Sequence, residues 1–471
     1  MSGELRGDFT RDTFDPQKNF LRVLMQQGRV QIDADWNEQV AILLHYIQTL
    51  AEDLIGPHGG PMNNSGFKIT FNTQENDLQI STGNYYVNGI LCQNYKNDTT
   101  YYTQPYYPLD KNQDKLPNLP FLVFLDVWER HITYIEDEAI REVALGGADT
   151  GTRSQVIWQV KVKELDEEIT SCDNIKWDEL LEVWQPKNRG LLAAKAKETS
   201  EQTEACIIKP DSRYRGRENQ LYRVEIHIGG SATEKPTFKW SRENSSVIFP
   251  IDADTPVEII GSKTTVKLKH WWRDSRFGLA EGDWVEIIND YVSLHHLAKP
   301  LWKIEKIEPE DFLVTLSGEE TSRQNIGKNP LLRRWEQKQK SGLNLINGTI
   351  PISLAENDWF TLEEGVQIKF QNSNSEQKYR TGDYWLIPAR TATGDVEWPK
   401  DTDGKTSQHI PPHGVKHHYA PLAVIADEDN QNNQRESDCR HKFNYLPRSY
   451  YYSDVQQAID EELIWQNSEV E

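Results

Sequence analysis

Short apolar runs with a period of two, separated by turn residues, recur along this chain from Gly66 onward. Residues 222–228 alternate Tyr, Val, Ile and Ile with Arg, Glu and His, which is the pattern of a strand with one buried face. Residues 121–128 are almost continuously apolar and predict a strand covered on both faces. The pair Asn88-Gly89 lies between two further apolar runs and predicts a tight hairpin. We therefore expect a mainly β chain.

The length of 471 residues predicts two to four domains, at roughly 100–200 residues each. Changes in pattern suggest boundaries between several small β-sandwich or β-barrel modules in an α+β chain. The expected units are a helical docking segment (1–57), a β-rich module with one helix near 136–145 (58–165), a charged connector or insertion (166–215), β-sandwich or barrel modules (216–320), a linker (321–345), a β module (346–430) and a tail with a short helix (431–471).

The first 57 residues predict a helical hairpin. A short helix is expected to open at Asp15-Pro16 and to close at Gly28, because the apolar residues between them have helical spacing. A longer helix is expected from Asp35, where Glu38 would complete a capping box, to Gly56. Its apolar residues form one stripe. We expect this segment to dock on a neighbour, with these interface candidates: Phe20, Leu24, Trp36, Val40, Leu43, Ile47 and Leu50.

Charge and hydropathy exclude two classes of partner. The formal net charge of -21 argues against nucleic acid, whose phosphates require clustered Lys and Arg. No stretch approaches the roughly 18 apolar residues of a membrane span, so we expect a soluble chain without direct membrane insertion. The four cysteines have no CxxC or regular spacing, which predicts neither a disulfide framework nor a zinc site and favours a reducing compartment.

Motifs that would carry catalysis are missing. The sequence has no GxGxxG after a strand, no HExxH and no GxSxG, so we expect no catalytic residues, no cofactor and no enzyme activity. Asp33, Asp35 and Glu38 offer too few oxygen ligands for a hard cation and are interpreted as residues that mark and cap the start of a helix. Arg6-Gly7-Asp8 matches a cell-adhesion tripeptide. A match of only three residues arises by chance, so we expect no adhesion function.

Two sets of residues leave alternatives open. His409, His413, His417 and His418 could hold a transition metal, although a Pro-Gly loop with polar decoration is favoured and no metal site is predicted. Trp359, Trp385 and Trp398 could stack on a sugar, although core packing is favoured.

Five ordered stretches resemble one protein family. They are RGDFTRDTFDP with VLMQQGRVQIDADWNEQ, LDVWERHITYIEDEAIREVALGG, RENQLYRVEIHIGG with FKWSREN, GDYWLIPARTATGDVEWP, and HHYAPLAVI. Together they resemble the DUF6519 family, whose members are encoded in gene clusters for phage-tail-like contractile injection systems, notably in cyanobacteria and actinobacteria. The resemblance covers about Arg6 to Leu446.

The resemblance implies a structural role in the baseplate or tail-fibre network of a contractile particle. The implied partners are other baseplate or tail-fibre subunits, with multiple copies arranged by rotational symmetry. The implied location is a cytoplasmic assembly, within a particle anchored at a thylakoid membrane or released from the cell. SDVQQAIDEEL resembles the helical connector that precedes fibre segments, which suggests an adaptor. The alternatives are a carbohydrate- or receptor-binding tail protein and a hydrolase that uses the histidines at 409–418.

Overall fold

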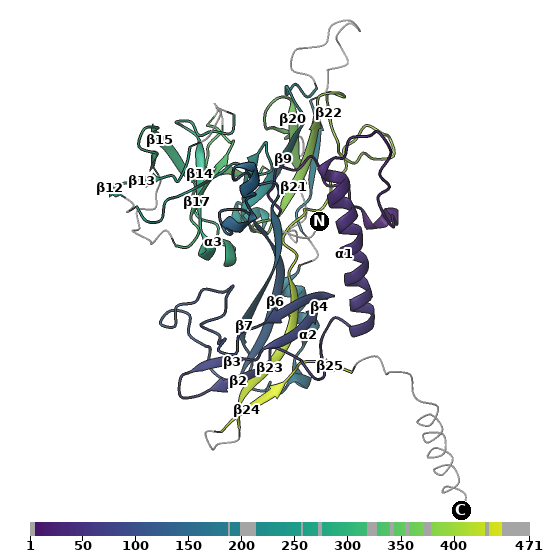
Figure 1. Cartoon of the computed structure of the whole chain (residues 1–471), viewed down its shortest axis with the longest axis vertical. Coiled ribbons are helices and arrows are strands. Elements are labelled where there is room, and N and C mark those ends of the chain that lie inside the picture. Colours follow the sequence, from purple (N-terminus) through teal and green to yellow (C-terminus); the bar gives the residue numbers. More distant parts are fainter. Residues whose placement is uncertain are drawn as a thin grey trace, which may run out of the picture.

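The computed structural model describes residues 5–186, 189–197, 213–255, 258–271, 276–317, 327–339, 343–353, 358–371, 378–428 and 433–444. Within these residues the chain is mainly β, as the sequence predicts. Its strands form three groups, and the strands of each group lie together in space (Figure 1). The short helix expected in the tail lies outside the described residues.

The first group contains a four-stranded sheet in the order β24 (Asn433–Asp438), β23 (His418–Glu428), β6 (Phe121–Ile132) and β7 (Arg153–Glu164). A second sheet joins β25 (Lys442–Phe443), β1 (His58–Pro61), β4 (Gly83–Val87) and β5 (Ile90–Asn94), and β2 (Ile69–Asn72) pairs with β3 (Asp77–Ile80). One apolar core lies between them. The predicted hairpin is confirmed, since Asn88 and Gly89 both have the positive φ of a tight turn between β4 and β5.

The long strand β6 explains why its sequence is almost entirely apolar. Its first eight residues are all buried, with one face in the core of the first group and Leu122 and Phe124 on the other. The helix α2 (Trp177–Trp184) covers that second face, where the rings of Trp184 and Phe124 stack with centroids 4.4 Å apart. Thus part of the stretch 166–215, expected to be irregular, is an ordered cover for β6.

The second group is a pair of packed sheets. One has the order β18 (Ile350–Pro351), β10 (Thr237–Ser241), β9 (Gln220–Ile228), β21 (Tyr384–Arg390) and β22 (Asp395–Val396). The other has the order β19 (Phe360–Thr361), β20 (Val366–Phe370) and β8 (Leu192–Ala196). Apolar side chains from both sheets share one core.

The third group is a curved seven-stranded sheet. Its order is β11 (Ile248–Pro250), β17 (Leu331–Trp335), β14 (Trp284–Ile288), β15 (Trp302–Glu308), β16 (Leu313–Ser317), β13 (Lys263–Lys267) and β12 (Glu258–Ile260). Ile251 and Leu268 form a bridge between the segments after β11 and β13, so the sheet curls into a barrel-like shape around its own core. The short helix α3 (Asp290–Leu294) follows β14.

Two helices expected from the sequence are absent. In the first, expected between Asp15-Pro16 and Gly28, only the 3-10 turn Pro16–Lys18 forms. Residues 136–145 contain the 3-10 turns Glu138–Ile140 and Val143–Leu145 instead of an α-helix. An isolated helix this short is marginal unless a packed face stabilises it. Both segments leave most of their large apolar residues exposed, so that stabilisation is missing.

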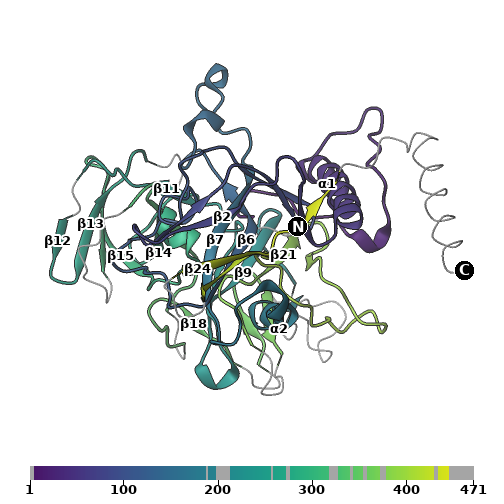
Figure 2. The same ribbon diagram turned by 90° about the horizontal axis from the view of Figure 1, so that it is seen from below.

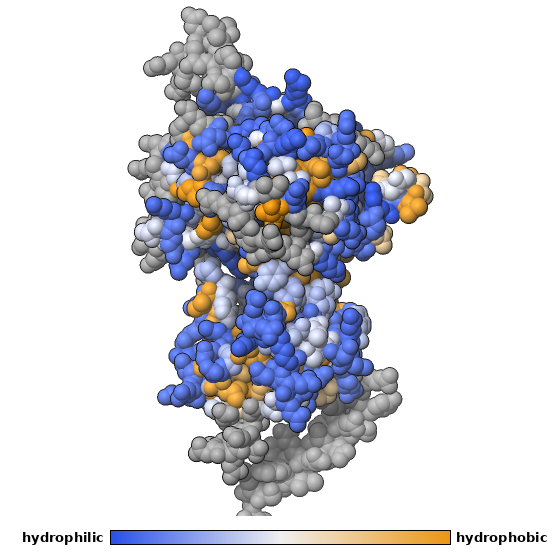
Figure 3. Space-filling model, turned by 90° about the vertical axis from the view of Figure 1, so that its left-hand side faces the viewer, coloured by the Kyte–Doolittle hydropathy of each residue, from blue (hydrophilic) through white to orange (hydrophobic). Residues whose placement is uncertain are grey.

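Consequently the N-terminal segment contains one long helix, α1 (Asp33–Ile55), and the predicted helical hairpin is wrong. The other 3-10 turns are Cys172–Asn174 and Ala232–Glu234. In Figure 1, α1 runs along one side of the molecule, and Figure 2 shows it at the periphery, outside the sheets. Figure 3 views a side away from α1, where hydrophilic residues predominate.

Candidate functional site

The helix α1 presents a row of large apolar side chains to solvent. We call the set Trp36, Val40, Leu43, Ile47, Leu50 and Leu54 the apolar face of α1. Their exposed fractions range from 39% for Val40 to 63% for Trp36. The interface candidates on α1 therefore lie on one exposed face. The other two candidates, Phe20 and Leu24, lie on the preceding residues 5–32, called the arm here, and are 57% and 69% exposed.

The opposite face of α1 is held against the rest of the chain. Ala34 and Ile42 are buried. The turn between β4 and β5 packs so closely on the helix that a Cβ at Gly89 would collide with the backbone oxygen of Gln48. Next to it, Nδ2 of Asn88 donates to Oε1 of Glu52 at 2.8 Å. The apolar face thus remains open because a different face of α1 makes the contacts with the body.

The acidic residues at the start of α1 fasten the arm. The carboxylate of Asp33 accepts hydrogen bonds from the backbone N of Thr10, at 2.8 Å, and from its hydroxyl. Glu38 accepts from the hydroxyl of Thr13 at 2.6 Å. The helix begins at Asp33, with Ile32 as its N-cap and no side-chain capping bond, so the predicted capping box from Asp35 is wrong. These carboxylates bind the arm, which the sequence pattern did not reveal.

Further along, the arm is anchored by a buried ion pair. Nη2 of Arg6 donates to Oε1 of Glu225 on β9 at 3.0 Å. Glu225 also accepts from Nε of Arg223 at 2.7 Å and lies 3.4 Å from Nζ of Lys239. Burial alone would raise the pKa of Glu225, but Arg6, Arg223 and Lys239 together hold it well below its ordinary value. Because Arg6 is only 8% exposed, the adhesion tripeptide is not presented to a receptor.

A cleft of about 2310 Å³ separates the start of α1 from the body. Trp36 and Leu44 of α1 line one wall, and His131, Tyr134 and Phe249 lie on the other side. Among the residues that the structure describes, no group of three or more His, Cys, Asp and Glu is placed to hold a metal ion. Both polar and apolar residues line the cleft, and its α1 wall continues into the apolar face.

The four histidines of 409–418 are not gathered around a common point. Nδ1 of His417 lies 2.7 Å from Oδ1 of Asp126, while the ring of His413 packs beside Tyr384. Burial lowers the pKa of both His413 and His418 to about 4. His417 and His418 are buried, whereas His409 and His413 are half-buried in different surroundings. The structure therefore does not bring these histidines together as one site.

The three tryptophans considered for sugar binding do not form a platform. Trp385 is fully buried and Trp398 is 8% exposed, and both belong to the core of the second group of strands. The ring of Trp359 is half-buried, and Nζ of Lys195 lies 4.6 Å from its centroid. Core packing, the favoured interpretation, is confirmed for Trp385 and Trp398.

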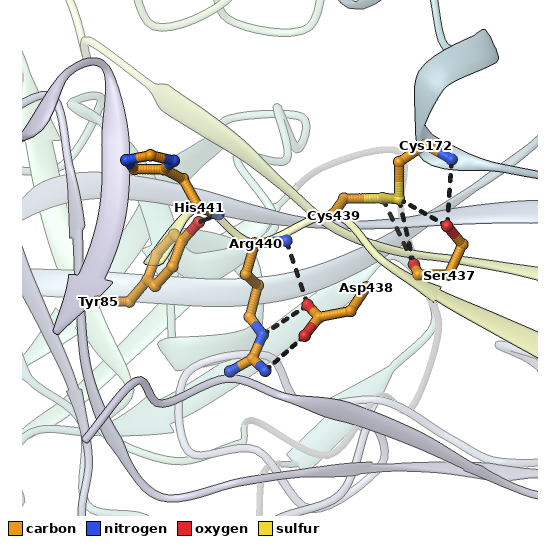
Figure 4. Close-up of a disulfide and its surroundings, with 7 residues drawn as sticks. All are labelled: Tyr85, Cys172, Ser437, Asp438, Cys439, Arg440 and His441. Atoms are coloured by element: carbon orange, nitrogen blue, oxygen red, sulfur yellow. Dashed lines mark hydrogen bonds and ion pairs between the residues drawn. A yellow bond between two sulfur atoms is a disulfide. The ribbon is translucent and has the colours of Figure 1, made fainter. Parts of the chain in front are cut away.

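A disulfide joins two distant parts of the chain near the C-terminal end of α1, called its foot here. Cys172 is bonded to Cys439, 267 residues away, so the prediction that no disulfide forms is wrong (Figure 4). Beside it, Nε of Arg440 donates to Oδ1 of Asp438 at 2.8 Å, and the backbone N of His441 donates to the hydroxyl of Tyr85 at 3.2 Å. Only the fold brings the two cysteines together, and their spacing carried no signal of it.

These contacts fix the strand β25 beside β1, where the chain leaves α1. Gly60 pairs with Lys442 and Pro61 with Phe443 in a parallel arrangement. A Cβ on Gly59 would lie 2.9 Å from Cγ2 of Ile55 and 3.3 Å from Cδ1 of Phe443, so the end of the helix meets both strands. Strands from the two ends of the described chain thereby support the foot of α1.

Comparisons with known proteins identify a family. No helix among the described residues is long and apolar enough to cross a membrane. Neither curated proteins nor solved structures gave a match. A family model, described as a family of unknown function, matches residues 5–176 and 166–460. The chain therefore belongs to the DUF6519 family.

Proposed function

We propose that this protein is a structural subunit of a larger assembly and that it docks through the apolar face of α1 together with the arm. One observation carries the proposal: six large apolar residues on one face of a helix are all exposed. Monomeric proteins seldom expose a contiguous apolar surface of this kind, which is typical of protein interfaces. Covering the exposed part of each side chain contributes on the order of 1 kcal/mol.

The assembly that we propose is a contractile injection particle, with this chain as a baseplate-peripheral subunit or tail-fibre adaptor. The resemblance of the five sequence stretches to proteins of such gene clusters supports this choice. The arm supports a docking role for α1, because Arg6 and Asp33 hold the arm to the body and to the helix start. A pre-positioned surface loses less entropy on binding than a loose segment.

The test is retention of variants in purified particles. Truncating residues 1–57 is unsuitable, because it would also remove Arg6 from the buried cluster around Glu225. We would instead introduce Leu43→Asp with Leu50→Asp into the full chain in cells that make the particle. The matched control is Val143→Asp with Leu145→Asp, two apolar residues 85% and 65% exposed on a 3-10 turn.

Particles are then isolated and the chain is quantified by mass spectrometry. The proposal expects the wild-type chain and the control in constant ratio to the sheath protein, and loss of the α1 variant. Retention of the α1 variant at the wild-type ratio would remove α1 as the docking surface. Absence of the wild-type chain from particles would refute the contractile assembly.

A further inference from the structure

The apolar face of α1 has a strict seven-residue repeat. Its members Trp36, Val40, Leu43, Ile47, Leu50 and Leu54 follow one another at intervals of four, three, four, three and four residues. In heptad notation, Val40, Ile47 and Leu54 occupy position a, and Trp36, Leu43 and Leu50 occupy position d. Apolar residues at a and d form the seam along which helices wind round each other. The surface is therefore shaped for another helix.

Beyond Val40 the seam points away from the body, while Trp36 and Val40 at its start also line the cleft. The buried Ala34 and Ile42 occupy positions b and c, on the far side of the helix from the seam. Glu38 and Glu52, both at position f, bind Thr13 of the arm and Asn88 of the hairpin turn. Contacts with the rest of the chain thus use positions b, c and f, but the arm also bonds Asp33 at position a and Gln39 at position g. The seam is uncovered from Leu43 to Leu54.

The residue types at the seam select the geometry of the pair. Val40 and Ile47 are β-branched residues at position a, and Leu43 and Leu50 are leucines at position d. This combination favours two parallel strands over three or four, because of how each side chain inserts between residues of the facing helix.

The flanking positions select a second copy as the partner. Helices that pair with a different sequence are usually matched by opposite charges at positions e and g. On α1 these positions hold Asn37, Gln39, Leu44, Tyr46, Ala51 and Asp53, of which only Asp53 is an acidic or basic residue. Two identical helices therefore meet with little repulsion, and Leu44 and Tyr46 widen the apolar contact.

We propose that α1 pairs with α1 of a second copy of this chain in a parallel, in-register, two-stranded coiled coil. The proposal rests on the proposed function in that it names the partner of the same surface. The unit that docks is then a dimer, in which the paired α1 helices connect the two copies of the chain.

The first test is sedimentation velocity of the full chain over a range of concentrations. Wild type is expected to be a dimer. Leu43→Asp with Leu50→Asp is expected to raise the dissociation constant at least ~100-fold, since it places charges where four leucines would be buried. Val143→Asp with Leu145→Asp should leave the dimer intact. Circular dichroism of each variant confirms that it is folded. A monomeric wild type would overturn the proposal, and a trimer would overturn the two-stranded geometry.

The second test fixes the orientation. In a parallel pair, the two copies of a residue at position d face each other within the reach of a disulfide. Leu43→Cys is therefore expected to give a covalent dimer on mild oxidation. Thr49→Cys, exposed at position c, should not. Equal cross-linking of both variants, or none by Leu43→Cys, would overturn the parallel register.

The two proposals fail in different ways. If the chain is monomeric in solution, yet substitution of Leu43 and Leu50 removes it from particles, self-pairing is refuted and docking through α1 stands. If the chain is a dimer that these substitutions dissociate, yet the variant stays in particles, self-pairing stands and docking through α1 is refuted.

Discussion

Arg6 and Glu225 form a buried ion pair across 219 residues of sequence, with 3.0 Å between Nη2 and Oε1. Glu225 keeps two further cations, Arg223 and Lys239, when Arg6 is removed. Even so, the arm would lose its buried anchor. We expect Arg6→Ala to lower the free energy of unfolding by about 2 kcal/mol, since a buried hydrogen bond to a charged group is lost. Urea denaturation measures this.

The control for that prediction is Arg11→Ala. Arg11 also lies on the arm and pairs with Glu397, but both side chains are about 40% exposed. An exposed pair contributes less than about 1 kcal/mol. Equal losses for the two variants would contradict the anchoring role of Arg6.

The close approach of the hairpin turn to α1 predicts a difference between two glycines. Gly89 and Gly146 both have positive φ, of 73° and 78°, but only Gly89 faces a neighbouring backbone. We expect Gly146→Ala to cost about 1 kcal/mol and Gly89→Ala about 3 kcal/mol, because the second adds a collision to the backbone strain. Hydrogen exchange should show faster exchange in α1 for Gly89→Ala alone. Unchanged exchange would refute the contact.

Buried histidines predict loss of stability in mild acid. Burial is the main cause that lowers the pKa of His58, His227, His413 and His418 to about 4, from 6.5. Between these values the unfolded chain binds protons that the folded chain does not, so stability falls as pH falls from 6.5 to 4. Glu243 acts in the opposite sense between pH 4.5 and 7, because burial, Asp8 and Glu336 raise its pKa to about 7.

Burial also raises the pKa of Glu363 and Asp383. The four histidines outnumber these three carboxyls, so we expect the melting temperature to drop between pH 7 and pH 5. Thermal melts at constant ionic strength check the trend. His413→Gln should reduce the slope, because one group that titrates differently in the two states is gone. A melting temperature that is flat or rises on acidification would contradict the prediction.

The Cys172–Cys439 disulfide predicts sensitivity to reduction. A bond that closes a loop of this length restricts the unfolded chain and thereby stabilises the folded state, typically by about 2–4 kcal/mol. We expect reduction, or Cys439→Ser, to lower the melting temperature, with little further effect of reductant on the variant. Peptide mapping without reduction should recover the linked peptides around both cysteines. Recovery of both as free thiols would refute the bond.

Local signals in the sequence predicted local structure well. Asn88-Gly89 was sufficient for the turn between β4 and β5, because few residue pairs adopt two successive positive φ angles. The apolar run of β6 predicted a strand buried on both faces. The exposed candidates on α1 were identified from their spacing alone.

Contacts between distant parts of the chain were beyond the sequence. The strand β9 pairs with β21, and β8 pairs with β20, through registers that depend on the whole fold. Helical spacing at residues 20–27 predicted a helix, but spacing does not show whether any surface is available to bury it. The hydrogen bond of Asp33 to Thr10 was missed because Asp near a helix start usually serves as a cap.

The anchoring of Arg6 by Glu225 also sets an order of events during synthesis. The arm and α1 leave the ribosome before β9, and the carboxylate that receives Arg6 is made 219 residues after it. The arm therefore reaches its final position only after β9 has emerged and paired. Only chains that have been translated past Glu225 can therefore anchor the arm. Shorter fragments of the chain cannot hold it in this position.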